Sequence, residues 1–269
     1  LVSHTPGLTV GEALAVRRDR MVSLLRARRP AVVLVELFPF GRKKFESELL
    51  PLLVAAHARG PIRPLVACSV RDLLVTARRS QQDFDDRAQV LCDRYFDLVL
   101  VHTDPEFARL EESFRPSTPL RTPVEYTGFL TRAGDESPAG ARHGLVVSAG
   151  SGHVGEALYR AAVAAHVVNW SDLRLPTTIV AGPFAPPNVV ASLQALAAVT
   201  EGLAVIPQVP SLGPLLSAAR ASVSQCGYNT ALDLLRTKVP ALVVPFAEGR
   251  ENEQSRRAER LAGRGLLRV

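Results

Sequence analysis

Residues 145–155 have the sequence Leu145-Val146-Val147-Ser148-Ala149-Gly150-Ser151-Gly152-His153-Val154-Gly155, in which an aliphatic run meets a glycine-rich loop before a stretch of helical period. Such a strand, loop and helix start can bind an anion. Glycines let backbone N–H groups approach an oxyanion, and the helix dipole adds favourable potential. We expect Gly150, Ser151 and Gly152 to supply the N–H groups, while His153 could bond a phosphate or face solvent. The spacing matches neither GxGxxG nor a Walker loop.

The same succession of aliphatic run, polar or glycine-rich turn and helical stretch recurs along the chain. The other runs are residues 31–35, 64–68, 97–101, 177–181, 203–206, 221–224 and 241–244. Near-continuous apolar strands that alternate with helices indicate parallel strands covered on both faces. The sequence therefore predicts an α/β fold with two Rossmann-like, doubly wound domains that face a cleft.

The domain boundaries follow from a polar stretch without period. Residues 131–143 are punctuated by glycine and proline and are expected to link an amino-terminal domain, 1–130, to a carboxyl-terminal domain, 144–269. The chain begins without an initiator methionine, with a loop that enters a helix, and residues 265–269 resemble the start of a strand. We therefore expect both domains to be incomplete, with truncation at both ends.

A second strand–turn–helix motif lies in residues 222–233, Ser222-Val223-Ser224-Gln225-Cys226-Gly227-Tyr228-Asn229-Thr230-Ala231-Leu232-Asp233. The strand meets a glycine turn at Gly227, and the first helical residues, Tyr228, Asn229 and Thr230, add N–H donors at the edge of the sheet. Asp233 lies about two turns further on. Its carboxylate could accept both hydroxyls of a ribose, or it could be an acid favoured by the helix dipole.

Ionisable side chains also follow the three aliphatic runs of the first half. Glu36 follows the first run, residues 69–72 (Ser-Val-Arg-Asp) the second, and residues 102–105 (His-Thr-Asp-Pro) the third. Ligands bind beyond the carboxyl ends of parallel strands, so Glu36, Asp72 and His102 are candidates for a general base at an acceptor site. Alternatively, Glu36 could be an exposed loop residue and Asp72 could pair with a neighbouring arginine.

The charge of the chain limits its partners. The formal net charge is +6, and of the 32 basic residues only Lys43, Lys44 and Lys238 are lysines. The arginines are scattered without interleaved aromatic residues, which argues against nucleic acid as a partner. Anionic lipid headgroups remain open as a contact, at the inner face of a membrane. No apolar run approaches the roughly 20 residues that cross a bilayer, and no leader is visible, so we expect a cytoplasmic protein.

The stretch from residue 222 to 266 resembles the carboxyl-terminal domain of glycosyltransferase family 28, which includes the N-acetylglucosaminyltransferase that completes lipid II. The resembling pieces are Gly227-Tyr228-Asn229-Thr230, Asp233, Val239-Pro240-Ala241-Leu242-Val243-Val244-Pro245-Phe246, Glu253-Gln254 and Arg257-Ala258-Glu259-Arg260-Leu261. Residues 148–152 and Tyr126-Thr127-Gly128 also fall where the family has its glycine loop and its Thr-Gly turn. The whole chain resembles a bacterial subgroup of predicted glycosyltransferases.

The resemblance implies a GT-B fold, with the donor in the carboxyl-terminal domain and the acceptor in the amino-terminal one. It implies that the 150–152 loop and the Gly227 turn hold a diphosphate and that Asp233 holds the ribose. Carried over by position, Glu253 and Gln254 reach the sugar hydroxyls, and the backbone near Val209 meets the base. The family has glutamate where Asp233 stands. Its amino-terminal glycine loop, with the histidine proposed as catalytic, has no counterpart and would precede Leu1.

The implied reaction is inverting transfer of a hexosyl or N-acetylhexosaminyl group from a nucleotide diphosphate sugar, UDP-linked, to the hydroxyl of a lipid-linked or small acceptor. If the general base precedes Leu1, this chain binds a nucleotide without transferring sugar; otherwise the base is among Glu36, Asp72 and His102. One alternative is a sugar-nucleotide 2-epimerase of the same fold. Another is a non-catalytic protein that binds nucleotide sugars.

We expect no metal and no cofactor besides the nucleotide-sugar substrate. Cys68, Cys92 and Cys226 are far apart and form no zinc or disulfide pattern, which fits a reducing cytosol. Asp83-Phe84-Asp85 does match the DxD pattern of metal-dependent glycosyltransferases. It lies in a polar stretch of helical period, however, so we favour a solvated helix there.

Overall fold

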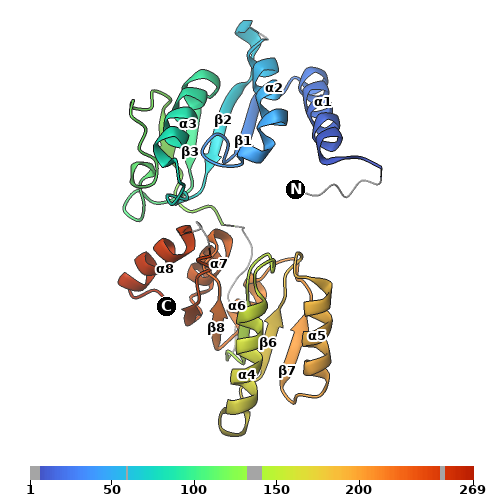
Figure 1. Cartoon of the computed structure of the whole chain (residues 1–269). Helices are drawn as coiled ribbons and strands as arrows, with labels where there is room; N and C mark the ends of the chain where they lie inside the picture. Colours follow the sequence, from blue (N-terminus) through green and yellow to red (C-terminus); the bar gives the residue numbers. More distant parts are fainter. Residues whose placement is uncertain (1–6, 59, 132–140, 249–251) are drawn as a thin grey trace. The chain divides into compact units, whose positions relative to one another are not determined.

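The computed structural model describes residues 7–58, 60–131, 141–248 and 252–269, and it divides into two compact units, Leu1–Leu130 and Thr131–Val269 (Figure 1). Each unit holds one sheet in which every pair of neighbouring strands is parallel, so both have the α/β architecture that the sequence predicts. Residues 132–140, most of the predicted linker, lie outside the described residues.

The first unit alternates strands and helices around one sheet, whose described strands have the order β1-β2-β3-β4. Its elements are α1 (Val10–Arg28), β1 (Val32–Glu36), η1 (Lys43–Phe45), α2 (Glu46–His57), η2 (Gly60–Ile62), β2 (Leu65–Val70), α3 (Gln81–Tyr95), β3 (Leu98–Val101), η3 (Leu110–Glu112) and β4 (Val124–Tyr126). The aliphatic runs predicted as strands become β1, β2 and β3. The sequence does not predict β4, because three residues are too few to show a strand period.

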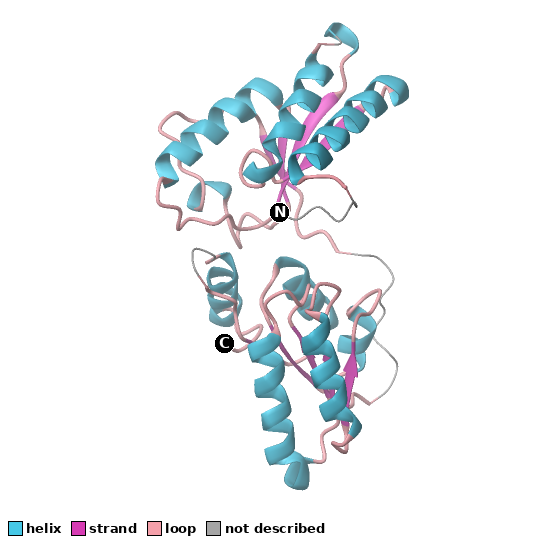
Figure 2. Ribbon diagram, turned by 45° about the vertical axis from the view of Figure 1, so that its right-hand side comes forward, coloured by secondary structure: helices cyan, strands magenta, loops and turns pink. Residues whose placement is uncertain are grey.

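The sequential strand order determines which face of this sheet is covered. Right-handed crossovers between strands that progress in one direction place α2 and α3 on the same face, and Figure 2 shows the helices of this unit in front of its strands. The side chains that point to that face include Val66, Cys68 and Val99, none of which is exposed. On the opposite face, Val32 and Leu34 of β1 are 54% and 58% exposed. Coverage of both faces, as expected from the sequence, therefore does not extend to β1.

The second unit has the order β7-β6-β5-β8-β9, which reverses direction at its centre. Its elements are β5 (Leu145–Ser148), α4 (Glu156–Leu173), β6 (Thr177–Val180), α5 (Pro187–Ala198), β7 (Leu203–Ile206), α6 (Gly213–Ala218), β8 (Ala221–Ser224), α7 (Tyr228–Thr237), β9 (Ala241–Val243) and α8 (Glu253–Gly263). All five predicted strands are present. The expected strand start at residues 265–269 is a single parallel bridge between Leu242 and Arg268.

The reversal makes this sheet doubly wound and positions its ligand edge. The chain runs from β5 through β6 to β7 in one direction and then returns to β8 and β9 on the other side of β5. The strand order therefore switches between β5 and β8, which are neighbours in the sheet. In open α/β sheets a ligand binds beyond the carboxyl ends of the strands at this switch point. Both glycine motifs singled out in the sequence follow these two strands.

The DxD motif lies in α3, as expected, but the expectation that it is solvated is wrong for its second aspartate. Asp85 is only 4% exposed. One of its carboxylate oxygens accepts a hydrogen bond from Gln81 Nε2 (2.7 Å), and the other accepts from the backbone N–H of Arg115 (3.0 Å). Asp83, in contrast, is exposed in the first turn of the helix. The first aspartate is thus a surface acid, while the second anchors the loop that follows η3.

Asp85→Asn is expected to destabilise the chain by about 1–3 kcal/mol, because the amide places an N–H where a carboxylate oxygen now accepts a hydrogen bond. Thermal unfolding followed by circular dichroism measures the effect. Asp83→Asn is the matched control and should change the midpoint little. Equal, small effects for both variants would contradict the anchoring role of Asp85.

Candidate functional site

The loop between β5 and α4 is built on backbone approaches that only glycine permits. Gly150 and Gly152 have φ angles of 61° and 84°, in the left-handed region. A Cβ atom on Gly152 would lie 2.0 Å from the carbonyl oxygen of Ala181, and one on Gly182 would lie 2.5 Å from the carbonyl oxygen of Gly150. The loops after β5 and β6 therefore pack backbone against backbone, which fixes the shape of the 150–152 loop.

The turn between β8 and α7 packs directly against this loop. The backbone N–H of Gln225 donates to the carbonyl of Ser148 (3.1 Å), and Gln225 Nε2 donates to the carbonyl of Val154 (3.1 Å). A Cβ atom on Gly150 would contact Thr230 Oγ1 at 3.4 Å, so the first turn of α7 lies beside the loop. The structure thus brings the two predicted glycine motifs together at the switch point.

Two helix N-termini without side-chain caps meet there. α4 starts after Gly155 and α7 after Gly227, and neither flanking residue offers a capping side chain. Within the described part of the chain, the backbone N–H groups of Ser151, His153 and Asn229 have no hydrogen-bond acceptor, and these residues are exposed. Unsatisfied N–H groups in a glycine-rich loop, as for Ser151 and His153, and at a helix N-terminus, as for Asn229, attract oxyanions. The arrangement suits a group with several negative oxygens, such as a diphosphate.

Helix α8 clamps the peptide before Gly227. Gln254 Oε1 accepts hydrogen bonds from the backbone N–H groups of Cys226 (3.1 Å) and Phe246 (3.2 Å). Arg257, which is 3% exposed, donates from a terminal nitrogen to the carbonyl of Cys226 (2.7 Å). The oxygen of Gln254, expected to reach a sugar hydroxyl, is thus already engaged in holding the turn. The sequence shows the resemblance of this helix to the family but not this clamp.

The remaining predicted donor residues differ in their accessibility. Tyr228 is only 8% exposed and lies against the Arg257 guanidinium, 5.9 Å from the ring centre, so only its backbone can face a ligand. Asp233 is partly exposed, and its Oδ1 lies 3.5 Å from a terminal nitrogen of Arg236. Glu253 carries a buried Oε2 for which the described residues provide no hydrogen-bond donor. Val209, in the loop after β7, has no hydrogen bond to the glycine motifs among the described contacts.

The three candidates for a general base in the first unit differ in burial and in bonding partners. Asp72 is 2% exposed, and its Oδ1 accepts from the backbone N–H of Leu73 (2.8 Å), so it does not reach an outside ligand. Glu36 pairs with Arg71 (2.9 Å) and lies near Arg42 (3.6 Å). Arg71, the arginine next to Asp72, is thus paired with Glu36.

His102 has the most base-like surroundings of the three. Its Nε2 lies 2.7 Å from Ser69 Oγ, and its Nδ1 lies 2.9 Å from Thr127 Oγ1. Burial lowers the pKa of His102 below the usual histidine value of 6.5, which favours the neutral imidazole. Ser69 and Thr127 lay inside quoted motifs, yet the sequence does not reveal their contact with His102, because β4 is not predicted.

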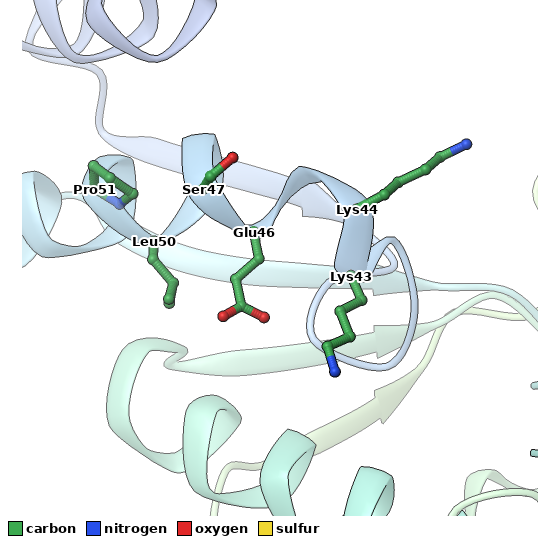
Figure 3. Close-up of a pocket in the computed structure, with 6 residues that line it drawn as sticks. All are labelled: Lys43, Lys44, Glu46, Ser47, Leu50 and Pro51. Atoms are coloured by element: carbon green, nitrogen blue, oxygen red, sulfur yellow. The ribbon is translucent and has the colours of Figure 1, made fainter. Parts of the chain in front are cut away.

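An open pocket in the first unit contains none of the predicted site residues. It has a volume of about 510 Å³ and is lined by Lys43, Lys44, Glu46, Ser47, Leu50 and Pro51, as Figure 3 shows. Glu46 is ion-paired with Arg87, and Lys44 extends away from it. These side chains belong to η1 and the first turns of α2, and none of them is among the residues of the glycine motifs or the candidates for a general base. The pocket is therefore not part of the candidate donor or acceptor site.

In the described ranges, no three His, Cys, Asp or Glu side chains gather as they would around a metal ion. None of the described helices combines the length and apolar character needed to cross a bilayer. All three cysteines are free and buried.

A valine at Gly227 is expected to lower ligand affinity, whereas a valine at Gly152 is expected to lower the stability of the fold. A Cβ atom on Gly227 meets nothing within 4 Å, so Gly227→Val should fold normally and weaken UDP binding by blocking approach to the turn. Gly152→Val should lower the thermal midpoint itself, because its Cβ would collide with a backbone carbonyl. Isothermal titration with UDP and circular dichroism measure the two effects. Normal UDP affinity in folded Gly227→Val would contradict a binding role for the turn.

Residues 187–269 match the family described as "Glycosyltransferase family 28 C-terminal domain". No curated protein matches the sequence. MurG of Acinetobacter baumannii is similar over 100% of this chain and 68% of its own length, with a TM-score of 0.53 and 16% identity.

Two further solved structures have a similar fold. A putative UDP-N-acetylglucosamine 2-epimerase from Listeria monocytogenes matches 100% of this chain and 69% of its own, with a TM-score of 0.60 and 14% identity. The spinosyn rhamnosyltransferase SpnG, in complex with thymidine diphosphate, matches 96% of this chain and 64% of its own, with a TM-score of 0.54 and 20% identity. The chain therefore has the GT-B fold of these structures, and residues 187–269 match the carboxyl-terminal domain of glycosyltransferase family 28.

Proposed function

We propose that this chain is a glycosyltransferase that moves a hexosyl or N-acetylhexosaminyl group from a nucleotide diphosphate sugar, UDP-linked, to an acceptor hydroxyl with inversion. The observation that carries the proposal is the meeting of two uncapped helix N-termini at the switch point of the second unit, in a family 28 context. The acceptor is a lipid-linked or small molecule. The basic, arginine-rich composition fits a cytoplasmic enzyme at the inner face of a membrane.

The donor is held by the second unit in this proposal. The N–H groups of Ser151, His153 and Asn229 bind the diphosphate oxygens, and Asp233 accepts the ribose hydroxyls. Glu253 accepts a sugar hydroxyl, which would give its buried Oε2 the hydrogen bond that the described residues do not supply. The backbone near Val209 meets the nucleotide base. Gln254 supports the Gly227 turn and presents its amide nitrogen to the sugar.

The chemistry needs two kinds of assistance. The acceptor oxygen attacks the anomeric carbon from the side opposite the diphosphate, and the carbon–oxygen bond to the diphosphate breaks with its electron pair. Helix N-termini stabilise the charge that develops on the leaving group without a metal ion. A general base takes the acceptor proton. Among the three candidates, His102 combines access with a lowered pKa, whereas Asp72 is buried and Glu36 is ion-paired.

A sugar-nucleotide 2-epimerase is the second candidate. The Listeria structure with that description has a TM-score of 0.60, against 0.53 for MurG. Such an enzyme would turn over the nucleotide sugar when no acceptor is present. A non-catalytic binding protein would bind UDP and show no turnover under either condition.

Asp233→Ala is expected to weaken UDP binding by about 1.5–3 kcal/mol, the worth of a hydrogen bond to a charged group. Isothermal titration measures the loss. Glu259→Ala, at an exposed acidic position of α8, is the matched control for the removal of one negative charge. If Asp233→Ala keeps the affinity of the unchanged chain, the ribose contact must lie elsewhere.

The proposed reaction is tested with the 269-residue chain and radiolabelled nucleotide sugars. A thermal-shift panel of nucleoside diphosphates first selects the base, since a ligand that binds the native state raises the midpoint. Transfer to lipid-linked and small hydroxyl acceptors is then measured with and without EDTA, and transfer should survive the chelator. Turnover without any acceptor would favour the epimerase. Binding without turnover in every arm would favour the binding protein.

A further inference from the structure

The carboxyl edge of the first sheet places Ser69, His102 and Thr127 side by side. Ser69 is the register partner of Leu100, which in turn is the partner of Glu125. Residues two positions apart on a strand point to the same face. His102 and Thr127 lie two positions beyond Leu100 and Glu125, so their side chains share the face of Ser69. The three come from the ends of β2, β3 and β4.

The directions of the hydrogen bonds follow from the chemistry of the partners. Thr127 Oγ1 lies 2.9 Å from the carbonyl of Gly128, and a carbonyl can only accept, so the single hydroxyl proton of Thr127 points there. Thr127 Oγ1 must then accept from His102 Nδ1–H (2.9 Å). A neutral imidazole carries one N–H, so Nε2 is the acceptor, and Ser69 Oγ donates its proton to it (2.7 Å).

Several charged groups lie on the elements around His102. Glu36, on β1 beside Ser69, is paired with Arg71, which follows on β2. Arg42 approaches the same carboxylate at 3.6 Å. Glu125 of β4, Asp72 after β2 and Asp104, whose Oδ1 accepts from the backbone N–H of Glu106, are further charged groups on the adjoining elements. The physical cause that lowers the pKa of His102 is burial.

We propose that Ser69 and His102 form a proton relay for the acceptor hydroxyl and that Thr127 is a positioning residue for His102. Ser69 Oγ accepts a hydrogen bond from the acceptor while it donates to Nε2. As the acceptor oxygen bonds to the anomeric carbon, its proton moves to Ser69 Oγ and the Ser69 proton moves to Nε2. The diphosphate leaves with the electron pair of the broken bond. The relay rests on the proposed transferase function, and it would place the base within this chain.

The tautomer is tested on the chain without any substrate. In ¹⁵N NMR spectra of the imidazole, His102 should be protonated at Nδ1 and bare at Nε2, with a pKa below 6.5. Thr127→Val should shift the tautomer balance towards Nε2–H, and Thr127→Ser should restore it. An Nε2–H tautomer in the unchanged chain would overturn the relay whether or not the chain transfers sugar.

The kinetic test separates the relay from folding and donor binding. His102→Gln should lower kcat by at least about 100-fold, the range of general base catalysis, with UDP affinity unchanged. Ser69→Ala should also lower kcat, and Thr127→Val should give an intermediate value that Thr127→Ser recovers. His57→Gln, a partly buried histidine bonded to the carbonyl of Tyr95, is the matched control and should keep wild-type activity.

The pH profile provides the readout that a purely structural role would not change. The base must be unprotonated, so the rate of the unchanged chain should fall as the pH drops through the lowered pKa of His102. This acid limb should vanish in His102→Gln and move in Thr127→Val. Transfer with an unaltered limb in His102→Gln would overturn the relay while the transferase function stands. No transfer by the unchanged chain with any donor would overturn both.

Discussion

Backbone-to-backbone packing beside β5 is the constraint on which the candidate donor site depends. Gly152 approaches the carbonyl of Ala181 and Gly182 approaches that of Gly150 so closely that any side chain would collide. This contact fixes the 150–152 loop against the neighbouring strand connection. Because the strand order reverses beside β5, the Gly227 turn is brought against the same loop. Together, packing and topology leave unsatisfied N–H groups of the β5–α4 loop and of the first turn of α7 at one edge.

The candidate sites of the two units differ in the groups that would interact with charge on a ligand. The second unit offers backbone N–H groups and helix dipoles, which favour an anion and cost no reorganisation when charge develops. The first unit offers side chains: an exposed Glu36–Arg71 pair and a neutral His102 held by two hydroxyl groups. A leaving diphosphate requires the first kind of environment, and proton removal from a hydroxyl requires the second. This division agrees with a donor half and an acceptor half.

Much of the fold could be predicted because strands buried on both faces are aliphatic throughout. The run that forms β5 is an example. The glycine loops that follow β5 and β8 are also visible in the sequence. β4 could not be predicted, because Val124-Glu125-Tyr126 is short and follows a proline. β4 brings the hydroxyl group of Thr127 to His102, so this contact could not be predicted either. Asp85 and Arg257 look like surface charges in the sequence, and only tertiary contacts show that they are buried.

The contacts of Gln254 and Arg257 link α8 to the Gly227 turn of the candidate donor site. Gln254 and Arg257, one helical turn apart, hold the N–H and the C=O of the same residue, Cys226. These two hydrogen bonds couple the orientation of the turn to the docking of α8. A ligand that selects one orientation of the turn must therefore stabilise the docked helix by the same free energy. Docking of α8 therefore reports on the orientation of the Gly227 turn through the backbone of a single residue, Cys226.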